Sequence, residues 1–178
     1  MGFDLYGVNP MSVGTPPVRP TSDFNYESEE WKNYFAEQEF YERLNPGVYF
    51  RSNVWYWRPV VDFIQSLGAD EAMIRKLSYN DGAIISEEEF KDFIVLFYNM
   101  VEDGGLDHYI QARQAEIDSL PDEECPTCDG SGIRFSEMCH SCNGKGMREN
   151  FMKNYPIDKD ILLEFFEFAK LSGGFTVH

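Results

Sequence analysis

Cys125-Pro-Thr-Cys128-Asp-Gly130-Ser-Gly132 and Cys139-His-Ser-Cys142-Asn-Gly144-Lys-Gly146 are two copies of one octet, C-x-x-C-x-G-x-G, and they hold all four cysteines of the chain. Two C-x-x-C pairs offer four thiolates to one tetrahedral ion, which is the ligand set of structural zinc sites. The glycines after each pair allow positive φ angles, so the backbone can turn tightly around a metal. The repeat predicts one Zn2+ ion held by Cys125, Cys128, Cys139 and Cys142. Redox dithiols and an iron–sulfur site are the alternatives.

A site with four cysteine ligands leaves no open position for water, so the predicted centre is structural and not catalytic. His140 lies between the ligands and could replace a thiolate, but four cysteines already complete the shell. Residues 125–148 carry three basic side chains, Arg134, Lys145 and Arg148, and two acidic ones, Asp129 and Glu137. The hairpin therefore carries a net charge of +1, and the rest of the chain carries −17. Such a hairpin is either a contact element or a solvated loop.

The two octets resemble the cysteine-rich zinc region of DnaJ-type co-chaperones, over residues 125–146 only. That family carries four octets and binds two zinc ions, so the resemblance implies one ion here, with the four cysteines as its ligands. The sequence has no J-domain His-Pro-Asp signature, and chaperone activity is therefore not implied. The opening Met-Gly-Phe-Asp-Leu-Tyr-Gly, residues 49–59 and residues 172–175 also resemble small uncharacterised proteins of bacterial viruses, which implies an origin but no activity.

Outside the octets, the chain has the composition of a folded, mainly helical protein. Its 178 residues are 43% hydrophobic and 16% aromatic, enough for a packed core. Prolines and polar residues over 1–26 predict an extended N-terminal arm, and residues 27–178 predict a single α-helical domain that contains the hairpin 125–146. We expect about five to six helices, a short four-cysteine zinc hairpin inserted before the last helix, and short terminal β-strands at 3–8 and 175–177.

Capping and stop signals mark where the helices begin and end. Ser28 and Asp70 are expected to cap helices, and Ser86 with Glu89 forms a capping box. Asp158 or Asp160 begins the last helix, and Pro59 fits the first turn of a helix that ends at Gly68.

Two further patterns have ordinary structural interpretations. Trp55, Tyr56 and Trp57 are interpreted as core; if this segment is extended, Trp55 and Trp57 share a face on which Arg58 can stack. Residues 81–88 resemble the second half of an EF-hand loop, but loop positions one and three would be Leu77 and Tyr79, which cannot ligate calcium. The pattern predicts a turn followed by a capped helix, and no calcium.

The chain holds 15 basic and 31 acidic residues, a net charge of −16. This charge disfavours direct nucleic-acid binding and favours a protein partner with a basic surface, although it could serve solubility alone. The sequence shows no membrane span and no secretory signal, and paired C-x-x-C motifs without a signal favour a reducing cytoplasm, that of a host cell if the protein is viral.

No catalytic or cofactor-binding motif is present, and none of His108, His140 and His178 lies in a metalloprotease or nucleophile motif. The sequence therefore predicts no catalytic residues. It favours a small cytoplasmic zinc-binding protein that acts as a protein–protein interaction module, phage-encoded and of accessory or host-takeover type. The alternatives are an acidic nucleic-acid-mimic inhibitor of a host defence or DNA/RNA-processing protein, and an enzyme with an unrecognised site.

Overall fold

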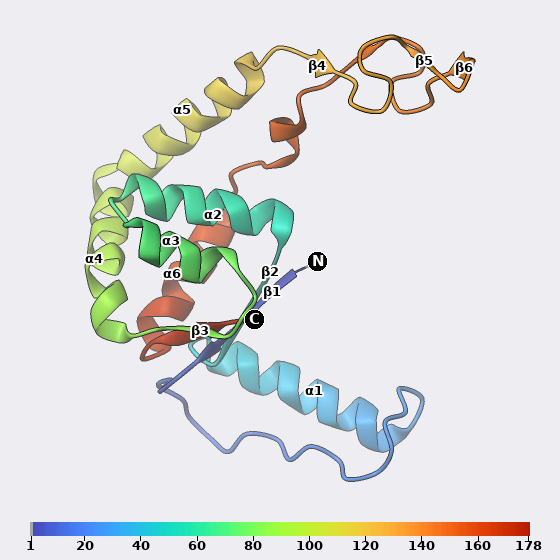
Figure 1. Ribbon diagram of the computed structural model, residues 1–178. Helices are drawn as coiled ribbons and strands as arrows, with labels where there is room; N and C mark the ends of the chain where they lie inside the picture. Colours follow the sequence, from blue (N-terminus) through green and yellow to red (C-terminus); the bar gives the residue numbers. More distant parts are fainter. Residues whose placement is uncertain (1) are drawn as a thin grey trace.

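Four short strands form one antiparallel sheet in the computed structural model, which describes residues 2–178 (Figure 1). They are β1 (Gly2–Gly7), β2 (Tyr49–Asn53), β3 (Ala83–Ile85) and β8 (Phe175–Val177), in the spatial order β2-β1-β8-β3. Leu5 lies opposite Phe50 and Val177, and all three side chains are buried. Buried and exposed residues alternate along β2, so one face of the sheet meets the core.

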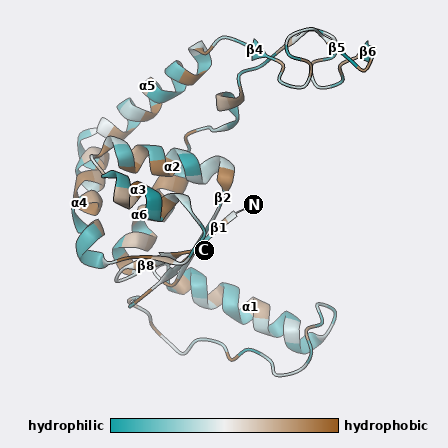
Figure 2. Ribbon diagram, viewed as in Figure 1, coloured by the Kyte–Doolittle hydropathy of each residue, from teal (hydrophilic) through white to brown (hydrophobic). Residues whose placement is uncertain are grey.

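Six α-helices occur in the described part of the chain: α1 (Glu29–Leu44), α2 (Val54–Ser66), α3 (Glu71–Ser78), α4 (Glu87–Asp103), α5 (Gly105–Ser119) and α6 (Lys159–Leu171). The 3-10 helix η1 (Phe151–Asn154) precedes the last of them. Hydrophobic residues, brown in Figure 2, concentrate along α2, α4 and α6. The prediction of a mainly α fold, with short terminal strands and the cysteine hairpin before the last helix, is confirmed.

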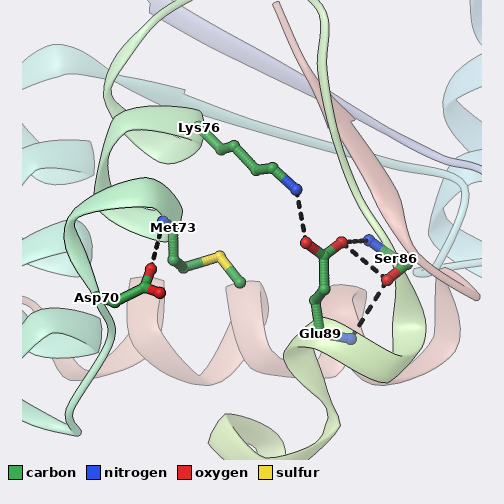
Figure 3. Close-up of polar contacts among 5 residues, drawn as sticks. All are labelled: Asp70, Met73, Lys76, Ser86 and Glu89. Carbon is green, nitrogen blue, oxygen red and sulfur yellow. Dashed lines mark hydrogen bonds and ion pairs between the residues drawn. The ribbon is translucent and has the colours of Figure 1, made fainter.

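Polar side chains cap α3 and α4 at the positions that the sequence indicates (Figure 3). The backbone N–H of Met73 donates to Asp70 Oδ1 at 2.8 Å. In the capping box of α4, the N–H of Glu89 donates to Ser86 Oγ at 3.3 Å, and the N–H of Ser86 donates to Glu89 Oε2 at 2.9 Å. Lys76 Nζ lies 2.6 Å from Glu89 Oε1, so the same carboxylate also joins α3 to α4.

Aromatic side chains from α4, α6 and β8 fill the core. The rings of Phe97 and Phe166 are stacked with centroids 4.0 Å apart. Phe90 packs edge-on against Phe165 and Phe175 at 5.8 and 5.3 Å. These side chains are at most 1% exposed, and aromatic pairs in such arrangements contribute beyond their buried area. Helices that are separated in sequence by the cysteine-rich segment therefore share one core.

Helix α2 begins earlier than Pro59, where the sequence predicted its first turn. The side chain of Asn53 caps the helix by accepting from the backbone N–H groups of Trp55 and Tyr56 at 2.9 and 3.3 Å. Pro59 therefore lies inside the helix, where its missing N–H leaves the carbonyl of Trp55 without a helical partner.

This earlier start separates the two tryptophans of the segment. Trp57 is fully buried, and its Nε1 donates to the carbonyl of Leu77 at 2.8 Å. Trp55 is 41% exposed. They do not share a face, because residues two apart on a helix point in different directions. The guanidinium of Arg58 lies over the ring of Tyr155, at 5.4 Å, and not over a tryptophan.

The segment between β1 and α1 folds back along α1. Trp31 is the one buried residue of that helix. Its Nε1 donates to the carbonyl of Asp23 at 3.0 Å, and Phe24 packs edge-on against it at 4.9 Å. Ser28 caps the helix as predicted. The division into an arm over 1–26 and one domain over 27–178 stays a prediction; residues 2–7 of that arm form an inner strand of the sheet, and Met1 lies outside the described residues.

The cysteine-rich segment leaves the body after α5 and returns at η1. Its strands are β4 (Glu123–Glu124), β5 (Ile133–Arg134), β6 (Glu137–Met138) and β7 (Met147–Arg148); β4 pairs with β7, and β5 pairs with β6. We call residues 123–148 the cysteine module and residues 130–138 its hairpin tip. In Figure 1 the module, drawn in orange, projects away from the helices.

Candidate metal centre

The two octets fold into turns with matching hydrogen bonds. In each, the N–H of the last glycine donates to the sulfur of the second cysteine at 3.3 Å, from Gly132 to Cys128 and from Gly146 to Cys142. The residue before that glycine donates to the carbonyl of the same cysteine, at 2.9 Å in the first octet and 3.0 Å in the second. N–H···S contacts favour the thiolate over the thiol. The sequence repeat is therefore also a structural repeat that presents two sulfurs per turn.

The last glycine of each octet is required by two independent constraints. Gly132 and Gly146 both have φ of 73°, which favours glycine. A Cβ on Gly132 would lie 2.3 Å from the carbonyl oxygen of Gly144, and a Cβ on Gly146 would lie 2.1 Å from that of Gly130. Each turn therefore packs its last glycine against the first glycine of the other turn. The positive φ angles were expected from the sequence, but this reciprocal contact was not.

Asp129 and Asn143, which directly follow the second cysteine of each octet, also have positive φ angles, of 47° and 50°. Asp and Asn enter the left-handed region more readily than other non-glycine residues, because their short polar side chains bond locally. These two positions were not expected from the sequence. An Asp or Asn at the same place in both octets was the signal that could have found them.

The four predicted ligands converge. The ligand atoms of Cys125, Cys128, Cys139 and Cys142 all lie within 4.8 Å of one another, and every one of these side chains is buried. The Sγ–Sγ distance is 3.9 Å between Cys125 and Cys139 and 3.7 Å between Cys128 and Cys142. Metal–sulfur bonds of about 2.3 Å in a tetrahedron place neighbouring sulfurs about 3.8 Å apart. The thiols are free, not disulfide-bonded, and their spacing fits one tetrahedral ion.

The ionisation of these crowded thiols is coupled. Burial opposes ionisation of Cys125, but hydrogen bonds from the backbone of Thr127 and from neighbouring thiols lower its pKa. Burial raises the pKa of Cys128, and the neighbouring thiols add to that effect, while the backbone N–H of Gly132 opposes it. Crowded thiols cannot all ionise together without a cation to compensate their charge. The donor set therefore suits a divalent ion.

His140 is exposed and is not one of the converging side chains. Within residues 2–178, no other group of three or more His, Cys, Asp or Glu side chains brings its ligand atoms together in this way. The described residues thus offer one candidate metal centre, which is the one that the octets predict.

An ion pair fixes the base of the module. Arg148 Nε and Nη2 donate to Glu123 Oε1 at 2.8 and 2.5 Å, across the β4–β7 pair. The same carboxyl has a lowered pKa because of its hydrogen bonds with Arg148. The guanidinium of Arg148 also lies 5.9 Å from the ring of Phe151 in η1. These contacts join both ends of the module where it meets the body.

The hairpin tip carries large apolar side chains that nothing in the described chain covers. Phe135 is 86% exposed, Ile133 59% and Met138 57%. Phe135 and Ser136 both have positive φ angles, of 53° and 65°, as the two central residues of a type I′ hairpin turn do. This conformation costs free energy for a phenylalanine, and such strain is concentrated at functional sites.

Comparison of the chain with models of protein families, with curated proteins and with solved structures finds no match. Among the described residues, no helix has both the length and the apolar character that crossing a membrane requires.

Proposed function

We propose that the cysteine module holds one zinc ion through Cys125, Cys128, Cys139 and Cys142, and that the protein uses this module to bind another protein. The convergence of four buried thiols at tetrahedral spacing carries the first part of the proposal. Zinc in such a site supplies no catalysis; it holds the two turns together. The buried cluster within the module consists of the four cysteine side chains alone. The bound ion would therefore take the place of an apolar core there.

The exposed tip supports the contact function. Isolated exposed apolar residues are common, but Ile133, Phe135 and Met138 are contiguous across β5, its turn and β6. Contiguous apolar surface with a polar rim is typical of protein interaction sites. Arg134 lies 4.9 Å over the Phe135 ring and adds a cationic edge.

The charge distribution indicates the kind of partner. Residues 125–148 carry +1 and the rest of the chain carries −17, so a basic partner surface would be attracted to the acidic part of the chain while the tip makes apolar contact. We place this function in the cytoplasm. The resemblance of three segments to proteins of bacterial viruses supports a phage origin only, and the proposed accessory role, binding of a host protein, rests on the exposed tip.

Metal content tests the first part. Elemental analysis of purified protein should find one zinc per chain, and Cys125→Ser or Cys142→Ser should release it, because a three-thiolate site has lost a bond and its closed shell. Stoichiometric iron, or no metal with all four thiols intact, would contradict the zinc assignment.

A matched pair of substitutions tests the second part. Ile133 at the tip and Ile84 in β3 are each 59% exposed. If the tip binds the partner, Ile133→Ser should abolish capture of one host protein by the tagged chain, while Ile84→Ser should not. Equal capture by both variants would show that the tip is not the contact surface.

The net charge also favours a second candidate, an acidic inhibitor that occupies a nucleic-acid site. Salt dependence together with the Ile133→Ser variant separates the two. Binding by an acidic mimic should weaken steeply between 50 and 200 mM salt, as nucleic-acid binding does on the order of 10³-fold or more, and should persist in Ile133→Ser.

A further inference from the structure

A cavity of about 580 Å³ lies between α2, α3, the start of β1 and the chain around η1. Its apolar wall includes Phe3, Trp57, Val61 and Ile74, of which the first three are buried in the core and Ile74 is half-buried. Cavities that bind small molecules have volumes of about 300–1,000 Å³ and apolar walls with a few polar groups. This cavity has those properties, and no residue of the cysteine module lines it.

A guanidinium that makes no direct ion pair with a carboxylate lies at the polar side of the cavity. Arg58 Nη1 donates to the hydroxyl oxygen of Tyr155 at 3.1 Å, and both residues line the cavity. Within residues 2–178, no carboxylate oxygen lies within 4.0 Å of the Arg58 nitrogens. Arg58 therefore keeps donors available for a planar acceptor, and the Tyr155 hydroxyl still has its own proton to donate.

The one carboxylate of the cavity is already engaged. Asp62 Oδ2 lies 3.4 Å from Arg113 Nη2. Burial raises the pKa of the Asp62 carboxyl, and the charges of Arg113 and Arg58 oppose that effect. The negative charge of Asp62 therefore weakens the attraction of the cavity for an anion. The N–H donors of Arg58 nevertheless stay free, because Asp62 does not pair with them directly.

We propose that this cavity binds a small carboxylic acid with an apolar body, whose carboxylate pairs with Arg58 and whose body packs against Trp57 and Ile74. Planar, bidentate pairing with carboxylates is the interaction for which a guanidinium is best suited. The apolar wall would hold an aromatic or branched aliphatic group. This proposal does not depend on zinc or on a protein partner.

The cavity also joins the body to the chain that leaves the cysteine module. Met152 and Tyr155, which line it, follow β7 within eight residues, whereas the remaining wall comes from the body. A bound acid would contact both parts. We therefore expect it to slow hydrogen exchange in residues 151–155 as well as in α2, and to leave exchange at the hairpin tip unchanged.

Calorimetric titration with 3-phenylpropionate, and with its neutral amide as the matched ligand, tests the proposal on the full chain. The acid should bind saturably, at millimolar concentration or below, and at least tenfold more tightly than the amide, because the amide loses the charge-assisted pair. Arg58→Gln should weaken binding of the acid at least tenfold. Arg75→Gln is the matched control, because Arg58 and Arg75 are both exposed but Arg75 does not line this cavity. The affinity of the Arg75→Gln variant for the acid should stay within twofold of that of the unmodified chain.

Two further variants test charge and space separately. Asp62→Asn should tighten binding of the acid and leave binding of the amide unchanged, because it removes only the competing charge. Ile74→Trp should abolish binding of both by filling the cavity, and it provides a test even if Arg58→Gln disturbs the contact with Tyr155. Equal affinity for acid and amide, unchanged binding in Ile74→Trp, or no saturable binding of the acid at 10 mM would overturn the proposal.

Discussion

Replacement of Glu89 by glutamine removes the charge that joins α3 to the start of α4 and nearly conserves the shape of the side chain. The Glu89 carboxylate accepts hydrogen bonds from Lys76 and from both the backbone and the hydroxyl of Ser86 (Figure 3). These contacts lower its pKa from 4.5 to about 2. A glutamine can still complete a capping box, so the substitution isolates the contribution of the charge.

The expected loss of unfolding free energy is roughly 1 kcal/mol. A pKa shift of this size would correspond to about 3 kcal/mol if all of it were coupled to folding. The Glu89 side chain is 45% exposed, however, and solvent and salt screen exposed ion pairs strongly. The reduced value lies at the upper end of the range of about 0.2–1 kcal/mol measured for exposed ion pairs. It corresponds to a lower Tm by about 2–4 °C for a chain of this length.

The pH dependence follows from the direction of the shift. Because the pKa of Glu89 is lower in the folded protein, its contribution is complete above pH 4.5 and is lost as the pH falls toward 2. The difference in unfolding free energy between wild type and Glu89→Gln should therefore be constant from pH 7 to 5. It should fall by more than half by pH 3. Urea unfolding followed by circular dichroism at each pH measures it.

Glu87 provides the control, because it is an exposed residue in the same first turn for which the structure gives no side-chain partner. Glu87→Gln loses only its interaction with the helix dipole, on the order of 0.3–0.5 kcal/mol. Equal losses for the two variants, or a difference that persists undiminished at pH 3, would refute the assignment of the stabilisation to the contacts of Glu89 with Lys76 and Ser86.

Three further outcomes are expected. Chelation of the metal should disorder the cysteine module and leave the circular dichroism signal at 222 nm nearly unchanged, because no α-helix lies within residues 123–148 and the large core contains none of them; loss of most of the helical signal would contradict this. Gly146→Ala should weaken metal retention, since its Cβ would lie 2.1 Å from the Gly130 carbonyl oxygen, whereas Gly14→Ala, at a similar φ of 82° with nothing within 4 Å, should not. Anisotropy titration with duplex DNA at about 150 mM salt should show no binding at micromolar concentrations, because the chain carries −16.

Local chemistry explains what could be predicted of the candidate site and of the helix ends. The two thiols of each octet and the positive φ of its glycines depend on residues within one short turn of chain. The caps at Asp70 and Ser86 likewise depend on residues within the first turn of each helix. The geometry of such groups is nearly fixed once the local turn or helix forms, so one sequence was enough to identify them.

The start of α2 was not predicted correctly from the sequence. The sequence predicted Pro59 in the first turn of this helix, and the cap that Asn53 forms was missed. In the structure the Asn53 cap decides where α2 begins, which places Trp57 in the core and leaves Trp55 partly exposed. The direction in which each tryptophan points depends on the residue at which the helix begins. With the start at Val54, Arg58 lies over the ring of Tyr155 and not over a tryptophan.

Local signals in the sequence were enough to predict the class of the fold, the caps at Ser28, Asp70 and Ser86, and the four cysteines that could share one ion. Tertiary contacts were needed to show that β1, β3 and β8 pair in one sheet, that the last glycine of each octet packs against the other octet, and that Arg58 and Tyr155 meet at a cavity. These features join residues that are far apart in sequence, such as Leu5 and Val177 near the two ends of the described chain. Periodicity and spacing describe neighbours along the chain, whereas long-range pairs form only when the whole core compensates the entropy of closing the loops between them.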